Sequence, residues 1–466
     1  MKTNLKFLQW LLISIFSVTT LEISAQVTTD PDHACLNSTQ TYYVLNTTGS
    51  TYNWVVSGGG TITSGQTTNQ ITILWTTVGS YTVTVTETLT STTGCIGIPV
   101  VLNVIVDPLP LPTLSGSASV CVASTGNTYT TESGMTNYAW VVSPGGTITG
   151  GGTSTDNTVT VTWNTAGPQT VQVNYLNLNG CTAALSTIYN VTVNPLPVVT
   201  LSGPSPVCVN STGNVYTTQA GMTTYAWLVS AGGTITAGGS STDNTVTVTW
   251  NTATPQTVSV NYHNANNCTA AASTIFPVTV NPLPVVTLSG LSPVCVNATG
   301  VVYTTEAGMT NYTWLISAGG TITSGGGTSD NTVTITWASA TPQTVSVNYT
   351  NATACTAATP TVFNVTVNPL PVITLTGNTP VCVNSQGNVY TTEAGMTNYI
   401  WLVSAGGTIT AGGSSTDNTV TITWLTATPQ TVSVNYTNGN NCVATLPHIL
   451  NITVSPLPAT SPIYHY

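Results

Sequence analysis

The sequence predicts an all-β chain: a tandem array of five antiparallel β-sandwich domains forming an elongated rod. A repeat predicts the number of domains, because four nearly identical copies and one more diverged copy begin at five cysteines that are 86 or 87 residues apart. Short stretches of alternating apolar and polar residues, with no helical period, predict strands that bury one face. A proline-rich linker closes each repeat, and two prolines in four residues favour extended rather than flexible connections.

We assign residues 1–25 to a signal peptide and five repeats to the rest of the chain. The repeats are residues 27–110 (repeat 1, diverged), 111–197 (repeat 2), 198–284 (repeat 3), 285–371 (repeat 4) and 372–458 (repeat 5), followed by a short tail at 459–466. The linkers occupy 107–110, 194–197, 281–284, 368–371 and 455–458.

Repeat 2 illustrates the strands expected in every repeat. In chain order they cover residues 121–122, 128–131, 138–142, 147–149, 158–163, 170–175 and 188–193. Val159, Val161 and Trp163 share one face, and the threonines between them share the other. About seven such strands, separated by turn residues, predict two sheets packed face to face.

The charge balance excludes several classes of partner. The only basic residues are Lys2 and Lys6, and there is no arginine. Nucleic-acid binding requires Lys and Arg to neutralise phosphates, so we expect no nucleic-acid partner. Attraction to anionic membranes fails for the same reason.

The N-terminus has the pattern of a secretory signal peptide. Lys2 and Lys6 precede a mostly apolar run at 7–18, and Ile23-Ser24-Ala25 is a small-residue cleavage site. An uncleaved anchor is the alternative, although the run is shorter than the roughly 20 residues that a span needs. We therefore expect a secreted or cell-surface protein without membrane insertion after cleavage, and the periplasm is the alternative destination.

Ten cysteines, two in each repeat, fit an oxidising compartment. Each repeat has its second cysteine 60 residues after its first, and we expect the two to form a disulfide within the repeat. The predicted bonds are Cys35–Cys95, Cys121–Cys181, Cys208–Cys268, Cys295–Cys355 and Cys382–Cys442. Zinc ligation is the alternative, but the spacing matches no zinc motif.

The order of these motifs resembles the PKD-like repeats of the polycystic kidney disease superfamily, which occur in secreted and surface proteins of Bacteroidetes. In repeat 2 the resemblance rests on Cys121, Tyr138-Ala139-Trp140, the Gly146–Thr149 turn and strand, the 158–163 strand and the 194–197 linker. It implies an immunoglobulin-like sandwich and an extracellular role as a spacer, adhesin or accessory module.

The sequence departs from the family pattern at two places. The turn after Trp140 has no carboxylate, whereas typical PKD domains have an acidic Trp-Asp-Phe-Gly-Asp-Gly turn. After the last linker, there is no room before Tyr466 for the sorting domain that often ends such exported proteins. We expect a truncated product, a fragment of a longer reading frame, or a periplasmic protein.

The sequence offers little for catalysis or cofactors. The four histidines recur at no equivalent positions, and no nucleophile elbow, zinc-protease motif or phosphate loop is present. We expect a non-enzyme without a cofactor. The recurring acids are weak calcium candidates, because calcium needs six to eight oxygens whereas Asp-Asn is a common turn pair. They are Asp156, Asp243, Asp330, Asp417, Glu132, Glu306 and Glu393.

The predicted function is a non-catalytic extracellular stalk or adhesive array at a bacterial surface. The alternatives are a polysaccharide-binding accessory module and a calcium-rigidified adhesin. Both tryptophans of each repeat fall on apolar strand faces, which favours core packing over sugar stacking. Glycans and cell-surface proteins are the partner classes left open, as is the oligomeric state.

Overall fold

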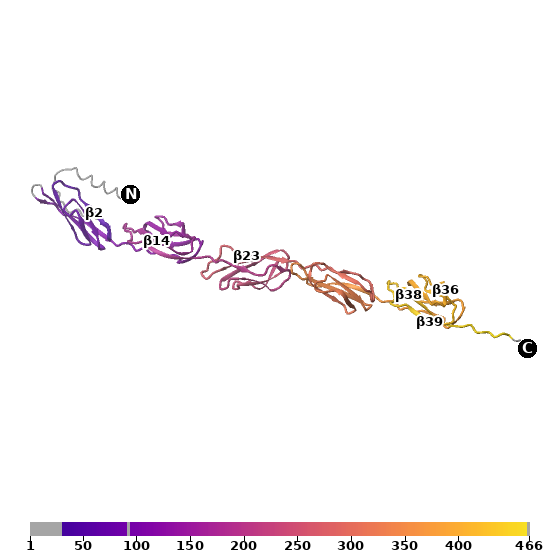
Figure 1. Cartoon of the computed structure of the whole chain (residues 1–466). Helices are drawn as coiled ribbons and strands as arrows, with labels where there is room; N and C mark the ends of the chain where they lie inside the picture. Colours follow the sequence, from indigo (N-terminus) through magenta and orange to yellow (C-terminus); the bar gives the residue numbers. More distant parts are fainter. Residues whose placement is uncertain (1–29, 91–93, 464–466) are drawn as a thin grey trace. The chain divides into compact units, whose positions relative to one another are not determined.

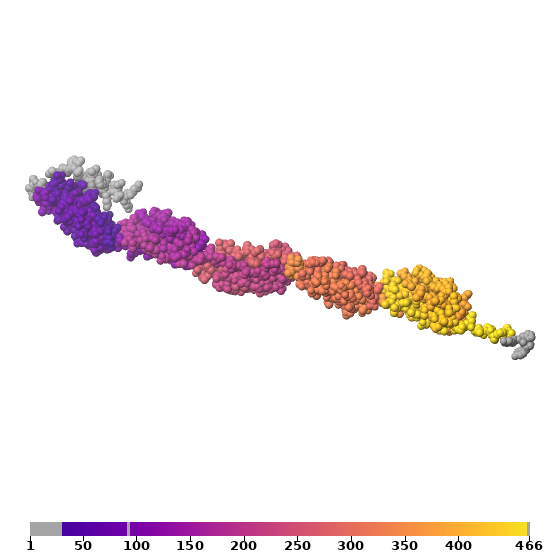
Figure 2. Space-filling model, viewed as in Figure 1, coloured from indigo at the N-terminus to yellow at the C-terminus, as the bar shows by residue number. Residues whose placement is uncertain are grey.

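The computed structural model describes residues 30–90 and 94–463, and the expected signal peptide lies outside them. The described part of the chain contains strands and no helix, and each repeat forms its own β-sandwich, as predicted (Figure 1). In the space-filling view, the visible face of the described repeats is filled, without a deep hollow (Figure 2). No helix in the described residues is long and apolar enough to span a membrane.

The strands follow the same order in every repeat. Repeat 1 contains β1 (Asp32–Cys35), β2 (Thr39–Tyr43), β3 (Ser50–Val56), β4 (Gly60–Ser64), β5 (Gln70–Trp75), β6 (Gly79–Leu89), β7 (Cys95–Ile96) and β8 (Val100–Asp107). Repeat 2 contains β9 (Ser119–Cys121), β10 (Asn127–Thr130), β11 (Thr136–Val142), β12 (Gly146–Gly151), β13 (Thr158–Trp163), β14 (Gly167–Leu176) and β15 (Thr187–Asn194). These are the seven strands that the alternation of repeat 2 predicts.

Repeats 3 to 5 add one short strand at the start. Repeat 3 contains β16 (Leu201–Ser202), β17 (Val207–Cys208), β18 (Asn214–Thr218), β19 (Thr223–Val229), β20 (Gly233–Gly238), β21 (Thr245–Trp250), β22 (Pro255–His263) and β23 (Thr274–Asn281). Repeat 4 contains β24 (Ser289–Gly290), β25 (Val294–Cys295), β26 (Val301–Thr304), β27 (Thr310–Ile316), β28 (Gly320–Gly325), β29 (Thr332–Trp337), β30 (Pro342–Thr350) and β31 (Thr361–Asn368). Repeat 5 contains β32 (Thr376–Gly377), β33 (Val381–Cys382), β34 (Asn388–Thr391), β35 (Thr397–Val403), β36 (Gly407–Gly412), β37 (Thr419–Trp424), β38 (Pro429–Thr437) and β39 (His448–Ser455).

Two sheets form each sandwich. In repeat 2, one sheet has the order β10-β13-β12 and the other β11-β14-β15-β9. The first sheets of repeats 3 to 5 gain the extra short strand at one edge, for example β16-β18-β21-β20. The chain divides into two compact units: one contains repeats 1 and 2 with residues 198–199, 219–225 and 261–273 of repeat 3, and the other contains the rest of repeat 3 with repeats 4 and 5.

One edge pairing in each sandwich is parallel, unlike the fully antiparallel sheets predicted. The strand that ends at the first cysteine pairs in parallel with the last strand of the same repeat, as β9 does with β15. In that pairing Cys121 lies opposite Asn194, the first linker residue. The other repeats place Cys35, Cys208, Cys295 and Cys382 opposite Asp107, Asn281, Asn368 and Ser455. The first cysteine is therefore held where the chain leaves the sandwich, which we call the distal end.

A buried Trp–Tyr pair lies at the centre of every core. Trp163 is fully buried, and its indole Nε1–H donates a hydrogen bond of 3.1 Å to the Tyr129 hydroxyl. The two rings meet edge to face with centroids 6.3 Å apart. The same pair recurs as Trp75–Tyr42, Trp250–Tyr216, Trp337–Tyr303 and Trp424–Tyr390. Because the indole N–H would otherwise be buried without a partner, this bond removes a penalty of about 1–3 kcal/mol.

The Gly-Gly turn is needed because the tryptophan ring packs directly on its second glycine. A Cβ built at Gly407 would lie 2.6 Å from a ring carbon of Trp424 and 2.8 Å from the Val403 side chain. The equivalent glycines Gly60, Gly146, Gly233 and Gly320 meet their tryptophans in the same way. The indole ring is rigid and the core around it is closely packed, so the ring cannot move away from an added Cβ.

We predict that Gly407→Ala destabilises repeat 5 by about 1–3 kcal/mol, the usual cost of overpacking. In calorimetry, the part of the heat absorption due to one repeat should then shift down by at least about 4 °C. Gly439→Ala is the matched control, because a Cβ at Gly439 meets nothing within 4 Å. Equal melting curves for the two variants would contradict this account of the turn.

Candidate functional site: the disulfide joints between repeats

The disulfides join neighbouring repeats and not the two cysteines of one repeat. The bonds are Cys35–Cys181, Cys121–Cys268, Cys208–Cys355 and Cys295–Cys442, with Cα atoms 5.5–5.7 Å apart. Each bond links the first cysteine of one repeat to the second cysteine of the next. The predicted pairs Cys35–Cys95, Cys121–Cys181, Cys208–Cys268, Cys295–Cys355 and Cys382–Cys442 are therefore wrong.

The two cysteines of one repeat lie at opposite ends of the sandwich, which explains the error. Cys121 is at the distal end, beside the last residue of β15. Cys181 follows β14, next to the bridge between Leu176 and Thr182, at the proximal end where the chain enters. The eight residues of β15 run between these ends and span about 25 Å. A disulfide needs Cα atoms within about 7 Å, so the intra-repeat bond cannot form.

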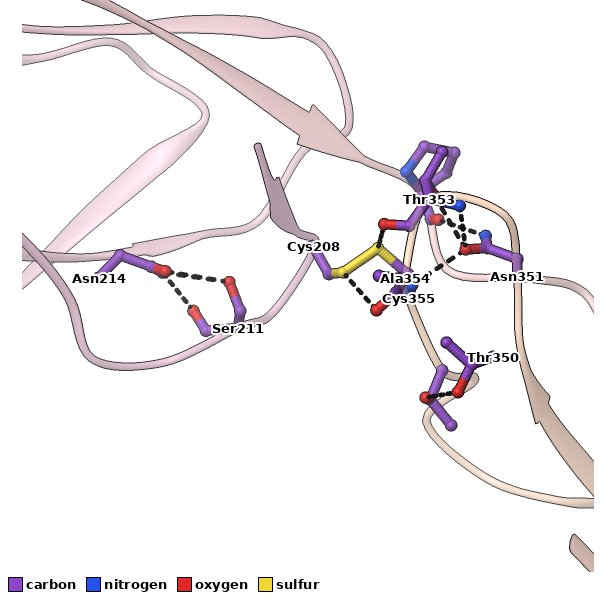
Figure 3. The surroundings of a disulfide bond; sticks show 10 residues. Cys208, Ser211, Asn214, Thr350, Asn351, Thr353, Ala354 and Cys355 are labelled. Atoms are coloured by element: carbon purple, nitrogen blue, oxygen red, sulfur yellow. Dashed lines mark hydrogen bonds between the residues drawn. A yellow bond between two sulfur atoms is a disulfide. The ribbon is translucent and has the colours of Figure 1, made fainter. Parts of the chain in front are cut away.

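An asparagine shapes the loop that carries each second cysteine. In repeat 4 the Asn351 Oδ1 accepts hydrogen bonds from the backbone N–H groups of Thr353 and Cys355, at 3.1 and 3.0 Å. Ala354 adopts a φ of 61°, and the equivalent residues in the other loops are Gly180, Asn267 and Asn441. The loop turns Cys355 inward, where it is fully buried. Figure 3 shows Cys355 on this loop, bonded to Cys208 at the end of β17.

The same asparagine ties the loop to the preceding linker. Asn351 Nδ2 donates to the Pro282 carbonyl at 3.5 Å, and Pro282 follows Asn281, the sheet partner of Cys208. The equivalent bonds run from Asn264 to Pro195 and from Asn438 to Pro369, at 3.2 and 3.3 Å. The linker therefore brings the first cysteine of one repeat to the cysteine loop of the next. The sequence signal was available but unused: an asparagine stands four residues before the second cysteine in repeats 2 to 5.

The segment that follows each linker is anchored in the core of its own repeat. After Pro284, Val285 is 86% exposed whereas Val286 is buried in a small cluster with Tyr312, Val347 and Tyr349. The Val286 carbonyl accepts a hydrogen bond from the Thr361 hydroxyl at 2.6 Å. Ile373 occupies the same position in the core of repeat 5. The chain is thus bound to repeat 4 from the second residue after the linker.

The recurring glutamates, three of the calcium candidates, hold the segment that follows each linker against its own repeat. The Glu306 carboxylate accepts hydrogen bonds from the Thr287 backbone N–H and hydroxyl, just after the linker, and from the Tyr349 hydroxyl at 2.8 Å. Glu132 and Glu393 bind the equivalent threonines and tyrosines. Repeat 3 has Gln219 instead, whose Oε1 accepts from Tyr262 while its amide donates to the Val198 carbonyl.

These hydrogen bonds shift the acid–base behaviour of the glutamates. Burial alone would raise the pKa of Glu306, but hydrogen bonds from Thr287, Thr305 and Tyr349 outweigh burial and lower it to about 2. The pKa values of Glu132 and Glu393 are lowered to about 2 for the same reason. The charged carboxylate is therefore the form that holds the entering segment of the repeat.

The four aspartates among the calcium candidates shape their own loops. The Asp156 carboxylate accepts hydrogen bonds from the Thr153 backbone N–H and hydroxyl, at 3.0 and 2.5 Å, and these bonds lower its pKa. Asp243 and Asp417 bind Ser240 and Ser414 alike, and Asp330 accepts from the Gly327 N–H. Within residues 30–90 and 94–463, no group of three or more His, Cys, Asp or Glu side chains could hold a metal.

A family model described as a PKD-like domain matches five segments of the chain, residues 21–95, 107–191, 194–278, 281–365 and 368–452. No curated protein matches the sequence.

Solved structures with tandem domains align with much of the chain but superpose poorly. The human desmocollin-1 ectodomain is 9% identical, covers 93% of this chain and 99% of its own, and has a TM-score of 0.23. The protocadherin γB4 extracellular domain is 12% identical, covers 91% and 83%, and scores 0.24. The Escherichia coli adhesin FdeC is 17% identical, covers 55% and 96%, and scores 0.23. Scores this low carry no inference about function.

We predict that the three glutamates make stability depend on acid pH. Their folded-state pKa lies below the unfolded value of about 4.3, so their stabilisation is complete above that value and is lost as the pH falls toward about 2. Between pH 5 and pH 2, the melting temperature of the triple variant Glu132→Gln, Glu306→Gln, Glu393→Gln should fall by less than that of the wild type. The reverse change, Gln219→Glu, should increase the loss. Parallel curves for all three proteins would contradict this role.

Proposed function

Because the chain belongs to the family of PKD-like domains, we propose that it is a non-catalytic extracellular stalk whose joints are fixed by disulfides. The observation that carries this proposal is the set of four bonds between successive repeats. Disulfides persist in oxidising compartments, which supports export through the N-terminal leader to the cell surface, or else to the periplasm.

The disulfides act at the joints because the sandwiches do not need them internally. Each core is closed by its own Trp–Tyr pair and the surrounding valines, such as Val159 and Val161 in repeat 2. A linker alone would allow neighbouring domains to move independently, which is the usual behaviour when the interface between domains is small. The bond through Cys208 and Cys355 and the asparagine–linker hydrogen bond together restrain that motion.

We predict that reduction loosens the joints and leaves the sandwiches folded. Small-angle scattering of the purified chain should show a broader range of dimensions after treatment with a phosphine reductant than before. Circular dichroism and tryptophan fluorescence should be unchanged, since Trp163 and its equivalents lie in cores without a disulfide. Identical scattering profiles before and after full reduction would contradict the stalk function. Loss of the fluorescence signal would show that the disulfides stabilise the domains instead.

Adhesion is a second candidate function, and a repeated surface feature favours it. On the outer face of the sheet that contains the last strand, two exposed apolar residues flank a central polar residue in every repeat from 2 to 5. In repeat 4 they are Leu315 (71% exposed) and Val362 (58%), on either side of Ser346. The other pairs are Val141–Ile188, Leu228–Ile275 and Leu402–Ile449. Four similar patches on one chain could bind a repetitive surface with high avidity.

The patches favour adhesion to a glycan or protein at a cell surface over the two alternative functions, a polysaccharide-binding accessory module and a calcium-rigidified adhesin. A polysaccharide-binding module would display a row of aromatic rings. Among the described residues, however, the tryptophans are buried or half-buried, and the strongly exposed aromatic ring is that of Tyr43. A calcium-rigidified adhesin would need carboxylates that are available to a metal, whereas Glu306 and Asp156 are engaged by their own chain.

We predict that removing the patches weakens adhesion more than in proportion to their number. The variant Leu228→Ser, Leu315→Ser, Leu402→Ser should lose at least tenfold in apparent affinity for any insoluble polysaccharide or cell surface that retains the wild type. A matched triple change of exposed threonines in the opposite sheet, Thr236→Ser, Thr323→Ser, Thr410→Ser, should retain binding. If the wild type binds no member of such a panel, adhesion is excluded for those surfaces and the stalk function stands alone.

A further inference from the structure

Repeat 1 contains a cavity at its proximal end, which is the end opposite Cys35. The volume of this cavity is about 260 Å³. Val85 and Glu87 of β6 and Val100, the first residue of β8, form part of its wall. The described residues that line it are Val44, Val85, Glu87, Gly97, Ile98 and Val100. The half-buried Glu87 side chain is the charged group in this otherwise apolar lining.

The cavity lies where the other repeats hold the segment that follows their linker. Val85 pairs with Val100 in repeat 1 as Val347 pairs with Thr361 in repeat 4. In repeat 4 the Thr361 hydroxyl donates to the Val286 carbonyl, and Val286 is buried in a cluster with Val347. Val286 stands nine residues before the first cysteine of its repeat. Also buried are the residues at this position in the other three repeats, which are Pro112, Val199 and Ile373.

Two hydroxyls that hold the entering segment in repeat 4 are replaced by valines in repeat 1. The first is that of Thr361, and Val100 takes its place. The second is that of Thr305, which donates to the Thr287 carbonyl at 2.6 Å. Val44 takes its place, two residues after the tyrosine of the core pair. The cavity in repeat 1 therefore offers more apolar surface to a side chain and fewer donors to a backbone carbonyl.

The carboxylate at this place in repeat 1 comes from a different strand. In repeat 4 the Glu306 carboxylate accepts hydrogen bonds from the Thr287 N–H and hydroxyl and from the Tyr349 hydroxyl. In repeat 1, Leu45 stands at the position of the glutamate and Glu87 at the position of the tyrosine. The cavity thus keeps an acceptor for a backbone N–H and a hydroxyl, although the residue that supplies it has changed.

We propose that this cavity binds an extended, uncharged segment of another protein, in which prolines are followed by an aliphatic residue and a threonine. The aliphatic side chain enters between Val44, Val85 and Ile98, and the threonine N–H and hydroxyl donate to Glu87. Donors without a negative charge complement a carboxylate in an apolar wall. Prolines hold such a segment extended before it binds, which reduces the entropy lost on binding. The proposal adds a partner to the stalk and does not rest on the adhesive patches of repeats 2 to 5.

A synthetic peptide with the sequence of residues 282–288, blocked at both ends and labelled with fluorescein, is the probe. Its sequence is Pro-Leu-Pro-Val-Val-Thr-Leu. Fluorescence anisotropy with the chain that lacks its leader, residues 26–466, should show saturable binding of one peptide per chain. A peptide with aspartate in place of the second valine should bind at least tenfold more weakly, because its carboxylate would be buried beside Glu87. Absence of binding, or equal affinity for the two peptides, would overturn the proposal.

A wall variant tests the place of binding. Ile98 is 49% exposed, so Ile98→Asp should leave repeat 1 folded and reduce the affinity for the peptide at least tenfold. Ile275→Asp is the matched control, since Ile275 is 64% exposed and belongs to repeat 3. Circular dichroism and the melting curve of each variant show whether the fold is intact. Equal binding by two folded variants would mean that the peptide does not use the cavity.

A double-mutant cycle tests the contact with Glu87. Glu87→Gln and a peptide with valine in place of threonine should each weaken binding by a factor of about 5, because each removes a hydrogen bond to a charged group. Together they should weaken binding little more than either change alone, since both remove the same contact. Two effects that multiply fully would show that the threonine does not contact Glu87, and the assigned contact would be wrong.

The same assay distinguishes two other occupants. If the peptide binds a chain that begins at Asp30 but not the chain of residues 26–466, residues 26–29 of the chain itself compete for the cavity and the proposal is wrong. If a peptide of residues 456–463 binds more tightly than that of 282–288, and sedimentation shows dimers that this peptide dissociates, the occupant is a second copy. Equal binding by the two chains, with preference for the 282–288 peptide, is the result expected for a different protein.

Discussion

The parallel pairing of the first-cysteine strand with the last strand of the same sandwich determines how this molecule is connected. Because the two strands run in the same direction, the cysteine that opens a repeat ends beside the residue that leaves it, as Cys208 does beside Asn281. The end of the last strand at which this short strand pairs thus decides whether the disulfides stabilise domains or join them.

The hydrophobic core of each described repeat is packed without a disulfide, and the disulfides connect one repeat to the next. Small secreted domains often need an internal disulfide because their cores are limited. Here the fully buried Trp250 donates a hydrogen bond to Tyr216, and its ring packs against a glycine. Valines from both sheets fill the remaining space in the core. The stability of each domain and the restraint between domains therefore come from separate groups of residues.

Much of the fold could be predicted from the sequence, because the alternation of apolar and polar residues shows directly which side of a strand is buried. Val159, Val161 and Trp163 are all buried as expected, and the seven strands of repeat 2 lie where the pattern put them.

The disulfide partners could not be predicted from the sequence, because in a strict repeat the pairing within repeats and the pairing between neighbouring repeats are equally regular. Pairing within repeats gives a constant separation of 60 residues, and pairing between neighbours gives a separation of 146 or 147. Only the end of the sheet at which the first-cysteine strand pairs distinguishes them, and a two-residue strand such as β17 carries no pattern that reveals it. The glutamates were noticed for their charge, but their partners Thr287 and Tyr349 are distant in sequence, so their role in holding the entering segment could not be read from it.

The bonds between repeats also change how the chain would carry mechanical tension. A force that enters repeat 2 at Cys181 reaches Cys208 through 27 residues of backbone, crosses to Cys355, and reaches Cys382 through 27 more. This covalent route bypasses the residues between Cys208 and Cys355, including most of the sandwich of repeat 3. A second route runs from Cys121 to Cys268, Cys295 and Cys442 and overlaps the first. A pulled domain could therefore lose its fold without releasing its full length of chain, and a protease cut in the linker at 281–284 would leave the two halves attached.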